Sequence, residues 1–264
     1  MLLNFRTAEP ADGGREWRPG FEDWKFNGGA DINGGSDRGR GWLRLKFRDA
    51  LKRKRQGGSA YPARSFVKRG LDIVLASTML VALAPVLLSL AAAVRIDRGP
   101  ALFRHRRIGA NGRPFYCLKF RSMCVDAETR LKDYLVKNPE AQAEWDRDFK
   151  LKSDPRITRL GNLMRRTSLD ELPQLINVLK GDMSLVGPRP IVPAEIPRYG
   201  DSFSAYLRCR PGITGLWQVS GRNDVDYGTR VELDTRYASD WTIITDARIL
   251  LRTVAVVFRR SGAY

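Results

Sequence analysis

The chain contains little histidine and little cysteine. Its 264 residues include one histidine, His105, and three cysteines, Cys117, Cys124 and Cys209. A single histidine leaves little material for His-based acid–base catalysis or a His-rich metal site, so carboxylates must carry such chemistry. The cysteines are odd in number and show no CxxC spacing, which argues against a disulfide framework and a zinc site and favours a reducing compartment.

Acidic residues are outnumbered by basic ones. The chain has 46 Lys and Arg against 29 Asp and Glu, a formal net charge of +17. This excess implies a polyanionic partner: nucleic acid, an anionic membrane surface or phosphorylated substrates. The sequence shows no recognition helix, RRM signature or zinc finger, and its basic residues cluster beside apolar segments. We therefore expect anionic lipids and phosphorylated substrates and no nucleic acid, with a basic membrane-associated nucleic-acid-binding protein as an alternative.

The N-terminal part lacks hydrophobic periodicity and an evident cleavable signal peptide. Residues 1–60 are rich in Gly, Asp and Arg and are expected to form a disordered basic tail. Within it, Arg44 to Arg55 is basic and partly apolar, and it is either a segment lying on anionic lipid or a solvated tail. We expect no multi-span domain in this part of the chain.

One long apolar run extends from Ile73 to Val94. A helix of this length could just cross a hydrocarbon core of about 30 Å, so a single transmembrane helix is one interpretation. Pro85 breaks the run in its middle, and both flanks are basic, which places both ends on the cytoplasmic side. These features favour a re-entrant helix hairpin that bends at Pro85 and returns to the same face.

An adjacent pair of carboxylates, Asp170 and Glu171, closely follows two arginines, Arg165 and Arg166. This mixture of charges suits a phosphate with a divalent metal, because guanidinium groups bind phosphate oxygens while carboxylates bind the metal or attack phosphorus. Apolar spacing predicts a helix that begins close to Asp170, capped by Ser168 or Asp170. An N-cap acid followed by a solvated glutamate is the ordinary alternative.

The remaining elements are predicted from local patterns. Residues 101–108 and 113–120 flank an Asn-Gly turn and predict a β-hairpin. Residues 127–150 are charged and predict a solvent-facing helix, and residues 233–260 predict an interrupted helix. The mixture of apolar residues and Arg in this last segment favours an interfacial helix, with a buried core helix as the alternative.

Several motifs occur in a fixed order along the chain. They are Asp154-Pro155-Arg156-Ile157-Thr158, Ser168-Leu169-Asp170-Glu171-Leu172-Pro173-Gln174-Leu175, Asn177 through Pro190, and Arg210-Pro211-Gly212-Ile213-Thr214-Gly215. Together they resemble the bacterial sugar transferases, the monotopic phosphoglycosyl transferases, and within them the exopolysaccharide-initiating undecaprenyl-phosphate galactose or glucose phosphotransferases. The resemblance extends from about Lys68 to Tyr264.

The resemblance implies a mainly helical α+β fold: a re-entrant membrane helix hairpin plus a catalytic domain with a small β-hairpin and interfacial amphipathic helices. The expected organisation is a tail over 1–60, a membrane-embedded region over 61–98 and a phosphoglycosyl transferase domain over 99–264. It also implies the bacterial inner membrane as the location, with the catalytic domain facing the cytoplasm. Oligomeric state and sugar identity stay open.

The resemblance further implies transfer of hexose-1-phosphate from a UDP-hexose to undecaprenyl phosphate with Mg²⁺, through an aspartyl-phosphosugar intermediate. Asp170 is then the nucleophile and Glu171 its partner, with both as metal ligands. Arg165, Arg166, Pro188, Arg189 and Arg222 are the implied phosphate or nucleotide contacts. A non-catalytic membrane-associated scaffold for polysaccharide assembly is the other alternative.

Overall fold

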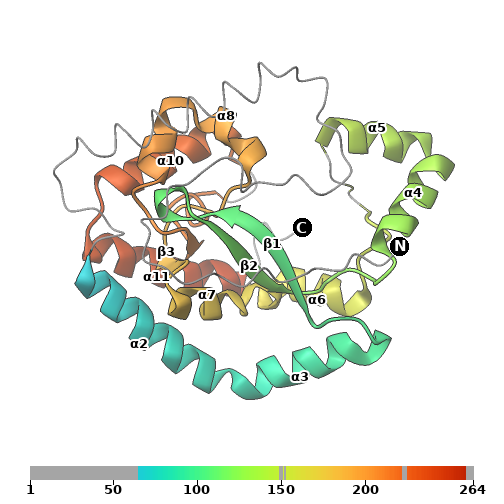
Figure 1. Ribbon diagram of the computed structural model, residues 1–264, viewed down its shortest axis with the longest axis horizontal. Coiled ribbons are helices and arrows are strands. Elements are labelled where there is room, and N and C mark those ends of the chain that lie inside the picture. The colour runs from blue at the N-terminus through green and yellow to red at the C-terminus, as the bar shows by residue number, and fades with distance from the viewer. Residues whose placement is uncertain (1–64, 149–150, 152, 222–224, 260–264) are drawn as a thin grey trace, which may run out of the picture.

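The computed structural model describes residues 65–148, 151, 153–221 and 225–259. The predicted tail over 1–60 and Arg222 lie outside these residues. The described part is mainly helical with two small two-stranded sheets, which confirms the α+β class. In Figure 1 the first two described helices run beneath the other elements, and the β-hairpin crosses the centre.

The apolar run forms two helices instead of one. Helix α2 (Phe66–Ala82) and helix α3 (Ala84–Val94) meet at Leu83, and Pro85 occupies the first turn of α3. A proline fits there because its missing N–H is not needed, whereas inside a helix it would remove a hydrogen bond. No single helix in the described ranges is long and apolar enough to cross a membrane. Helix α2 and its continuation Ala84–Asp97 reach the required length and apolar character only when they are taken together, and they are bent by 64°. The break at Pro85 is thus confirmed, and insertion of the pair in a membrane stays a prediction.

The outer surface of this bent pair is apolar. Its exposed large side chains include Phe66, Val67, Val74, Val81 and Leu88. Large exposed apolar surfaces are typical of regions that contact another protein or a membrane.

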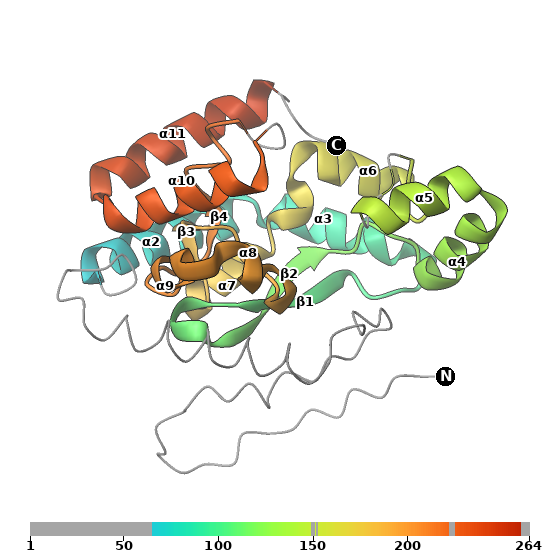
Figure 2. The ribbon, with the colours of Figure 1, turned by 90° about the horizontal axis from the view of Figure 1, so that it is seen from above.

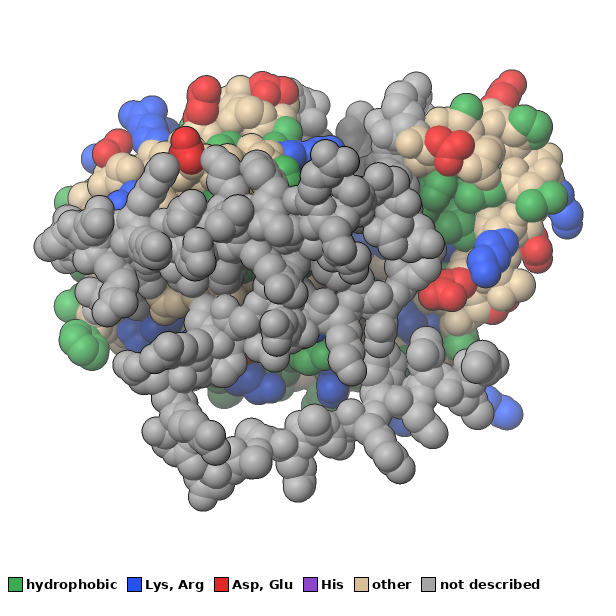
Figure 3. All heavy atoms as spheres, turned by 45° about the horizontal axis from the view of Figure 1, so that its top comes forward, with side chains coloured by type: hydrophobic (Ala, Val, Ile, Leu, Met, Phe, Trp, Pro, Cys, Tyr) green, Lys and Arg blue, Asp and Glu red, His purple; other side chains and the backbone are tan. Residues whose placement is uncertain are grey.

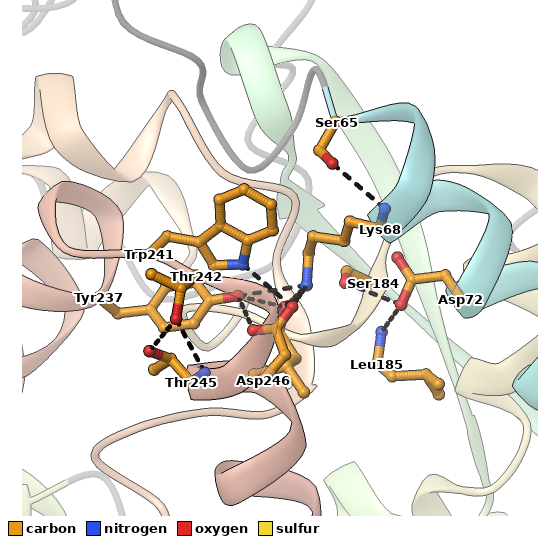
Figure 4. A network of polar contacts seen from close by, with 11 residues as sticks. Ser65, Lys68, Asp72, Ser184, Leu185, Tyr237, Trp241, Thr242, Thr245 and Asp246 are labelled. Atoms are coloured by element: carbon orange, nitrogen blue, oxygen red, sulfur yellow. Dashed lines mark hydrogen bonds and ion pairs between the residues drawn. The ribbon is translucent and has the colours of Figure 1, made fainter.

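The start of α2 is fixed to the C-terminal helices through Lys68, which is 4% exposed. Its Nζ donates hydrogen bonds to Val186 O at 3.0 Å and Tyr237 Oη at 3.2 Å, and it forms an ion pair with Asp246 at 2.5 Å (Figure 4). One helical turn later, Asp72 Oδ1 accepts hydrogen bonds from Ser184 Oγ and Leu185 N. These two charged side chains therefore face the protein interior.

The next residue, Arg69, also contacts another part of the protein. Its guanidinium donates to the carbonyls of Val178 and Leu179 in the last turn of α7 (Gln174–Lys180) at 2.5 and 2.8 Å. Carbonyls in the last turn of a helix lack the partners that the helix interior provides, and among the described residues only Val178 O of these two has a local donor, Gly181 N at 3.0 Å. Arg69 therefore caps α7 from another part of the chain.

The exit of α3 is fixed by Arg121. Its guanidinium donates to Val94 O at 2.8 Å, at the end of α3, and pairs with Asp97 at 2.5 Å. Arg121 directly follows the hairpin, so both ends of the bent pair are tied to the part of the chain that follows it.

The predicted β-hairpin is confirmed. Strand β1 (Leu102–Ile108) pairs antiparallel with β2 (Pro114–Phe120), from Leu102 opposite Phe120 to Ile108 opposite Pro114. The turn contains Asn111 at φ 60° and Gly112 at φ 78°. These are left-handed conformations that Asn and Gly adopt at low cost, which is why this pair of residues closes the hairpin.

The charged segment after the hairpin is two helices, α4 (Ala127–Lys137) and α5 (Pro139–Asp148), instead of one. Pro139 begins α5, and the extended Asn138 before it ends α4, as the residue before a proline is biased to do. Figure 3 shows acidic and basic side chains interspersed over this end of the molecule, on the right. The charges are consistent with the predicted solvent-facing role.

The central core lies between α2, α7 and the C-terminal helices. Strand β3 (Ser184–Val186) pairs in parallel with β4 (Gly212–Thr214), and α2 and α7 pack beside them. Helix α10 (Tyr227–Ser239) and helix α11 (Ile243–Arg259) are two separate helices (Figure 2), so the predicted interruption of the last helix is confirmed. Ile249 of α11 is buried in the core whereas Ile244, Leu251 and Val254 are exposed, so α11 has both a core face and an exposed apolar face.

Short helices connect β3 to β4 along the chain. They are η6 (Pro193–Glu195), α8 (Ile196–Tyr199), η7 (Gly200–Ser202) and α9 (Phe203–Tyr206). Their aromatic residues Tyr199, Phe203 and Tyr206 pack into a second core cluster with Ile108 of the hairpin. The hairpin is thereby held against this region.

Candidate active site

The two carboxylates lie in a short 3₁₀ helix, η5 (Leu169–Glu171), between α6 (Arg159–Thr167) and α7. The α-helix itself begins later than predicted, because α7 begins at Gln174 with Pro173 as its N-cap. Ser168 is left-handed, at φ 58°, and it both ends α6 and is the N-cap of η5, so the predicted cap at Ser168 is confirmed for the short helix that carries Asp170. The carboxylates therefore lie before the first turn of α7.

Lys119 of β2 lies against both carboxylates. Its Nζ is 2.5 Å from Glu171 Oε1 and 3.9 Å from Asp170 Oδ2. The sequence analysis did not identify Lys119 as a site residue, because the hairpin and the carboxylates are about fifty residues apart and nothing local pairs them. The signal available in the sequence was a lysine near the end of a strand that is otherwise mostly apolar, since lysine is rarely buried without a partner.

Asp170 is 8% exposed, and this burial controls its acidity. Burial raises the pKa of Asp170 to about 6; Lys119 and Arg165 lower the pKa, and Glu171 raises it further. The carboxyl is therefore a stronger base than an exposed aspartate, and above neutral pH it is still largely ionised.

Arg165 is confirmed as a neighbour of the carboxylates. It comes from the last turn of α6, its Nε donates to Ser122 Oγ at 2.8 Å, and its charge acts on Asp170. Helix α6 approaches this point closely because Gly161 has no side chain: a Cβ there would lie 1.9 Å from Ser122 O. Arg166 is exposed, and the described part of the structure gives it no contact with either carboxylate.

The segment Gly187–Pro190 directly follows β3 and lies alongside β4. Pro188 is buried and its carbonyl accepts from Gly212 N at 2.8 Å. A Cβ on Gly187 would lie 2.3 Å from Arg210 O, so this close packing of the two motifs requires glycine. Arg189 is exposed, with its guanidinium 5.9 Å from the ring centroid of Trp217. Among the described residues, no contact joins Arg189 to Asp170 or Glu171.

A second charged cluster lies beside Arg189. Arg107 of β1 donates to Pro190 O at 3.1 Å and lies 3.7 Å from Glu195, which is also 3.6 Å from Arg230 of α10. Arg230 lies over the rings of Trp217 and Tyr227, 5.0 Å from each centroid. Arg107 and Arg230 were not predicted, since they come from elements whose proximity only the fold creates.

A metal ion would need ligands from outside the protein. In the described ranges, no three His, Cys, Asp or Glu side chains gather to form a metal site. Mg²⁺ is commonly held by one or two carboxylates together with substrate phosphates, so Asp170 and Glu171 fit a metal that arrives with a phosphorylated substrate.

These observations define a class of protein: an α+β protein with a buried carboxylate beside Lys119 and Arg165, attached to a bent apolar helix pair. The sequence profile of the family described as bacterial sugar transferase matches residues 63–260. The chain belongs to this family.

Individual relatives agree with this assignment. The chain is 54% identical over 209 residues to the undecaprenyl-phosphate galactose phosphotransferase of Salmonella typhimurium, covering 79% of this chain and 44% of that protein. It is 45% identical over 208 residues to the exopolysaccharide production protein ExoY of Sinorhizobium fredii, covering 78% and 92%. It is 40% identical over 207 residues to the UDP-glucose:undecaprenyl-phosphate glucose-1-phosphate transferase of Escherichia coli, covering 75% and 41%. The chain thus spans less than half the length of several curated relatives.

Proposed function

We propose that this protein transfers hexose-1-phosphate from a UDP-hexose to undecaprenyl phosphate, giving the undecaprenyl-diphosphate-sugar and UMP. The observation that carries the proposal is the buried Asp170, with a pKa of about 6, placed beside Lys119 and Arg165. A carboxylate in this setting can attack an electron-poor centre while the cations hold the negative charge of a phosphate. The names of the relatives supply the substrate class, and they include both galactose and glucose.

The reaction has two displacements at the same phosphorus. An Asp170 oxygen attacks the sugar-bearing phosphorus, the bond to the bridging oxygen breaks, and the electron pair leaves with that oxygen on UMP. An oxygen of undecaprenyl phosphate then attacks the same phosphorus, the bond to Asp170 breaks, and the carboxylate is restored. Covalent catalysis of this kind gives ping-pong kinetics.

The neighbouring side chains have separate roles in these steps. Lys119 and Arg165 reduce the repulsion between the incoming phosphate and Asp170, and Lys119 holds Glu171 by its ion pair. Asp170 and Glu171 would hold Mg²⁺ together with the diphosphate. When bound, the ion supplies Lewis-acid neutralisation of phosphate charge.

The bent pair is proposed to enter the inner membrane and return to its cytoplasmic face, with the remainder of the chain in the cytoplasm. The exposed apolar side chains of α2 and α3 support this proposal, as does the position of Pro85 at the 64° bend. Because Lys68, Arg69 and Arg121 tie the ends of the pair to the rest of the protein, the site is held at a fixed depth relative to the bend. The exposed apolar face of α11 would lie on the same anionic lipid surface.

The test is reconstitution of the full chain in nanodiscs that contain undecaprenyl phosphate. With Mg²⁺ and UDP-galactose or UDP-glucose, we expect release of UMP and a hexose-labelled lipid. Asp170→Asn should abolish both, whereas Glu128→Gln, which neutralises an exposed acid on α4, should leave both unchanged. Full function of Asp170→Asn would instead support the scaffold, and binding of arbitrary DNA without sugar-nucleotide turnover would support the nucleic-acid alternative.

A further inference from the structure

The face of the hairpin that carries Lys119 also carries His105 and Arg107. In the β1–β2 register, Phe103 is opposite Lys119, His105 opposite Cys117 and Arg107 opposite Phe115. Residues directly opposite in an antiparallel pair point to the same face, as do alternate residues of one strand. Lys119, His105 and Arg107 therefore form a row that begins at the carboxylates and leads away from them.

Arg107 ends this row in a cluster with an excess of positive charge. Its guanidinium is held by Pro190 O and Glu195, and Arg189 is near enough that its charge lowers the pKa of Arg107, after the larger effect of burial. Glu195 is shared with Arg230, which also lies 4.0 Å from Asp234, so three guanidinium groups face two carboxylates. The remaining positive charge of such a cluster favours a bound anion.

His105 adds a neutral donor to the row. Arg107 Nη2 lies 3.1 Å from His105 Nδ1. Since a guanidinium only donates, Nδ1 is the acceptor and the proton of the neutral ring is on Nε2. Desolvation, then the charges of Arg107 and Lys119, lower the pKa of His105 to about 4, while Glu195 raises it. At neutral pH the ring is thus uncharged and retains a free Nε2–H in an exposed position.

We propose that Arg107, His105 and Arg189 form the site for the phosphate of the leaving nucleoside monophosphate. This inference rests on the proposed function. Lys119 and Arg165 bind the phosphate that Asp170 attacks. Arg107, His105 and Arg189 bind the other phosphate, which keeps the bridging oxygen and its electron pair. Arg107 and Arg189 stabilise the charge that develops there, and His105 donates a hydrogen bond through Nε2–H.

The chain has one histidine, so His105 gives a single imidazole signal in an NMR spectrum. The probe is UMP, added to the full chain in nanodiscs as Asp170→Asn, which permits binding without chemistry. We expect UMP to shift the His105 resonances and to raise the pKa of His105, because a nearby anion favours the protonated ring. Arg107→Gln should weaken UMP binding about tenfold or more, while Arg104→Gln, on the opposite face of the same strand, should not.

Activity measurements with Asp170 intact separate this inference from the proposed function. Arg107→Gln should raise KM for the UDP-hexose, and Arg107→Lys should restore part of the loss if the charge is what binds. Circular dichroism and thermal melting of both variants confirm folding. Unchanged UMP affinity and KM in Arg107→Gln, with an unmoved His105 signal, would overturn the leaving-group site while adduct formation still upheld the proposed function. No adduct and no turnover with any UDP-hexose in the wild type would refute the proposed function itself.

Discussion

The Nζ of Lys119 lies 2.5 Å from Oε1 of Glu171, which joins the hairpin to the 3₁₀ helix that carries Asp170. This ion pair brings a cation within 3.9 Å of the buried Asp170 carboxylate. The acidity of Asp170 thus depends in part on a residue from a strand about fifty positions earlier in the chain.

Removing this cation should slow the first displacement. Lys119→Met is expected to reduce the rate of adduct formation by about 10²–10³-fold, the range found when one preorganised charge-stabilising group is removed. Because Lys119 lowers the pKa of Asp170, the pH–rate inflection should move to higher pH. Single-turnover kinetics with UDP-hexose across pH 5–9 measure both effects. Lys119→Arg keeps the charge, so its rate of adduct formation should fall less. Equal decreases of the rate in the two variants would contradict an electrostatic role of Lys119.

Asp170 should cost the protein stability at neutral pH. Its pKa in the folded protein, about 6, is above the value of about 3.9 expected in the unfolded chain. The folded state therefore binds the proton more tightly: the contribution of Asp170 to stability is full below pH 4 and is lost as pH rises through about 6.

Asp170→Asn should accordingly raise the free energy of unfolding at pH 7.5 in the absence of Mg²⁺, by on the order of 2 kcal/mol. Denaturant unfolding of the wild type and the variant at pH 4.5 and 7.5 tests this, with the larger difference expected at pH 7.5. An Asp170→Asn protein that is less stable than the wild type at pH 7.5 would show that the ionised carboxylate does not destabilise the folded state.

The Lys68–Asp246 pair should anchor the bent helix pair. The Lys68 side chain is buried and that of Asp246 is 13% exposed, so Lys68→Met should cost about 3 kcal/mol by leaving the largely desolvated Asp246 without its cation. Lys68→Met with Asp246→Leu should cost less than the sum of the single variants, since no unpaired charge is left. Thermal unfolding in nanodiscs measures these differences. Strict additivity of the two changes would show that the pair is not coupled.

Two helical glycines provide a matched comparison. Gly161→Ala on α6 should destabilise the protein by more than about 2 kcal/mol and slow adduct formation, because the new Cβ would meet Ser122 O and displace Arg165. Gly70→Ala on α2 meets nothing within 4 Å and should stabilise α2 by about 0.5–1 kcal/mol. Melting temperatures and single-turnover rates of both variants test this, and similar losses in the two would contradict the close approach of α6.

Local patterns predicted the elements whose causes are local. The Asn-Gly turn defined the hairpin, and Pro85 located the break between α2 and α3. The start of α7 was mispredicted, because the left-handed Ser168 reverses the chain after α6 and nothing in its residue type requires this. Residues 127–150 were predicted as one helix, although Pro139 was there to divide them.

The candidate site was predicted only where its residues share one segment. Arg165, Asp170 and Glu171 were found together because they lie within seven positions. Lys119 and Arg107 were missed because tertiary pairing, and not sequence spacing, brings them to the site. Lys68 and Arg69 were counted as flanking charges at a membrane, whereas the fold uses them to bind Asp246 and to cap α7.

The central claim is that Asp170 carries the hexose phosphate covalently, and intact-mass spectrometry tests it most directly. Purified protein incubated with Mg²⁺ and the UDP-hexose, without lipid acceptor, should gain the mass of one hexose phosphate, and undecaprenyl phosphate should then remove it. Asp170→Asn should show no added mass, whereas Glu171→Gln should form the adduct more slowly. An Asp170→Asn protein that still gains the hexose phosphate, or that turns over at the wild-type rate, would contradict the account.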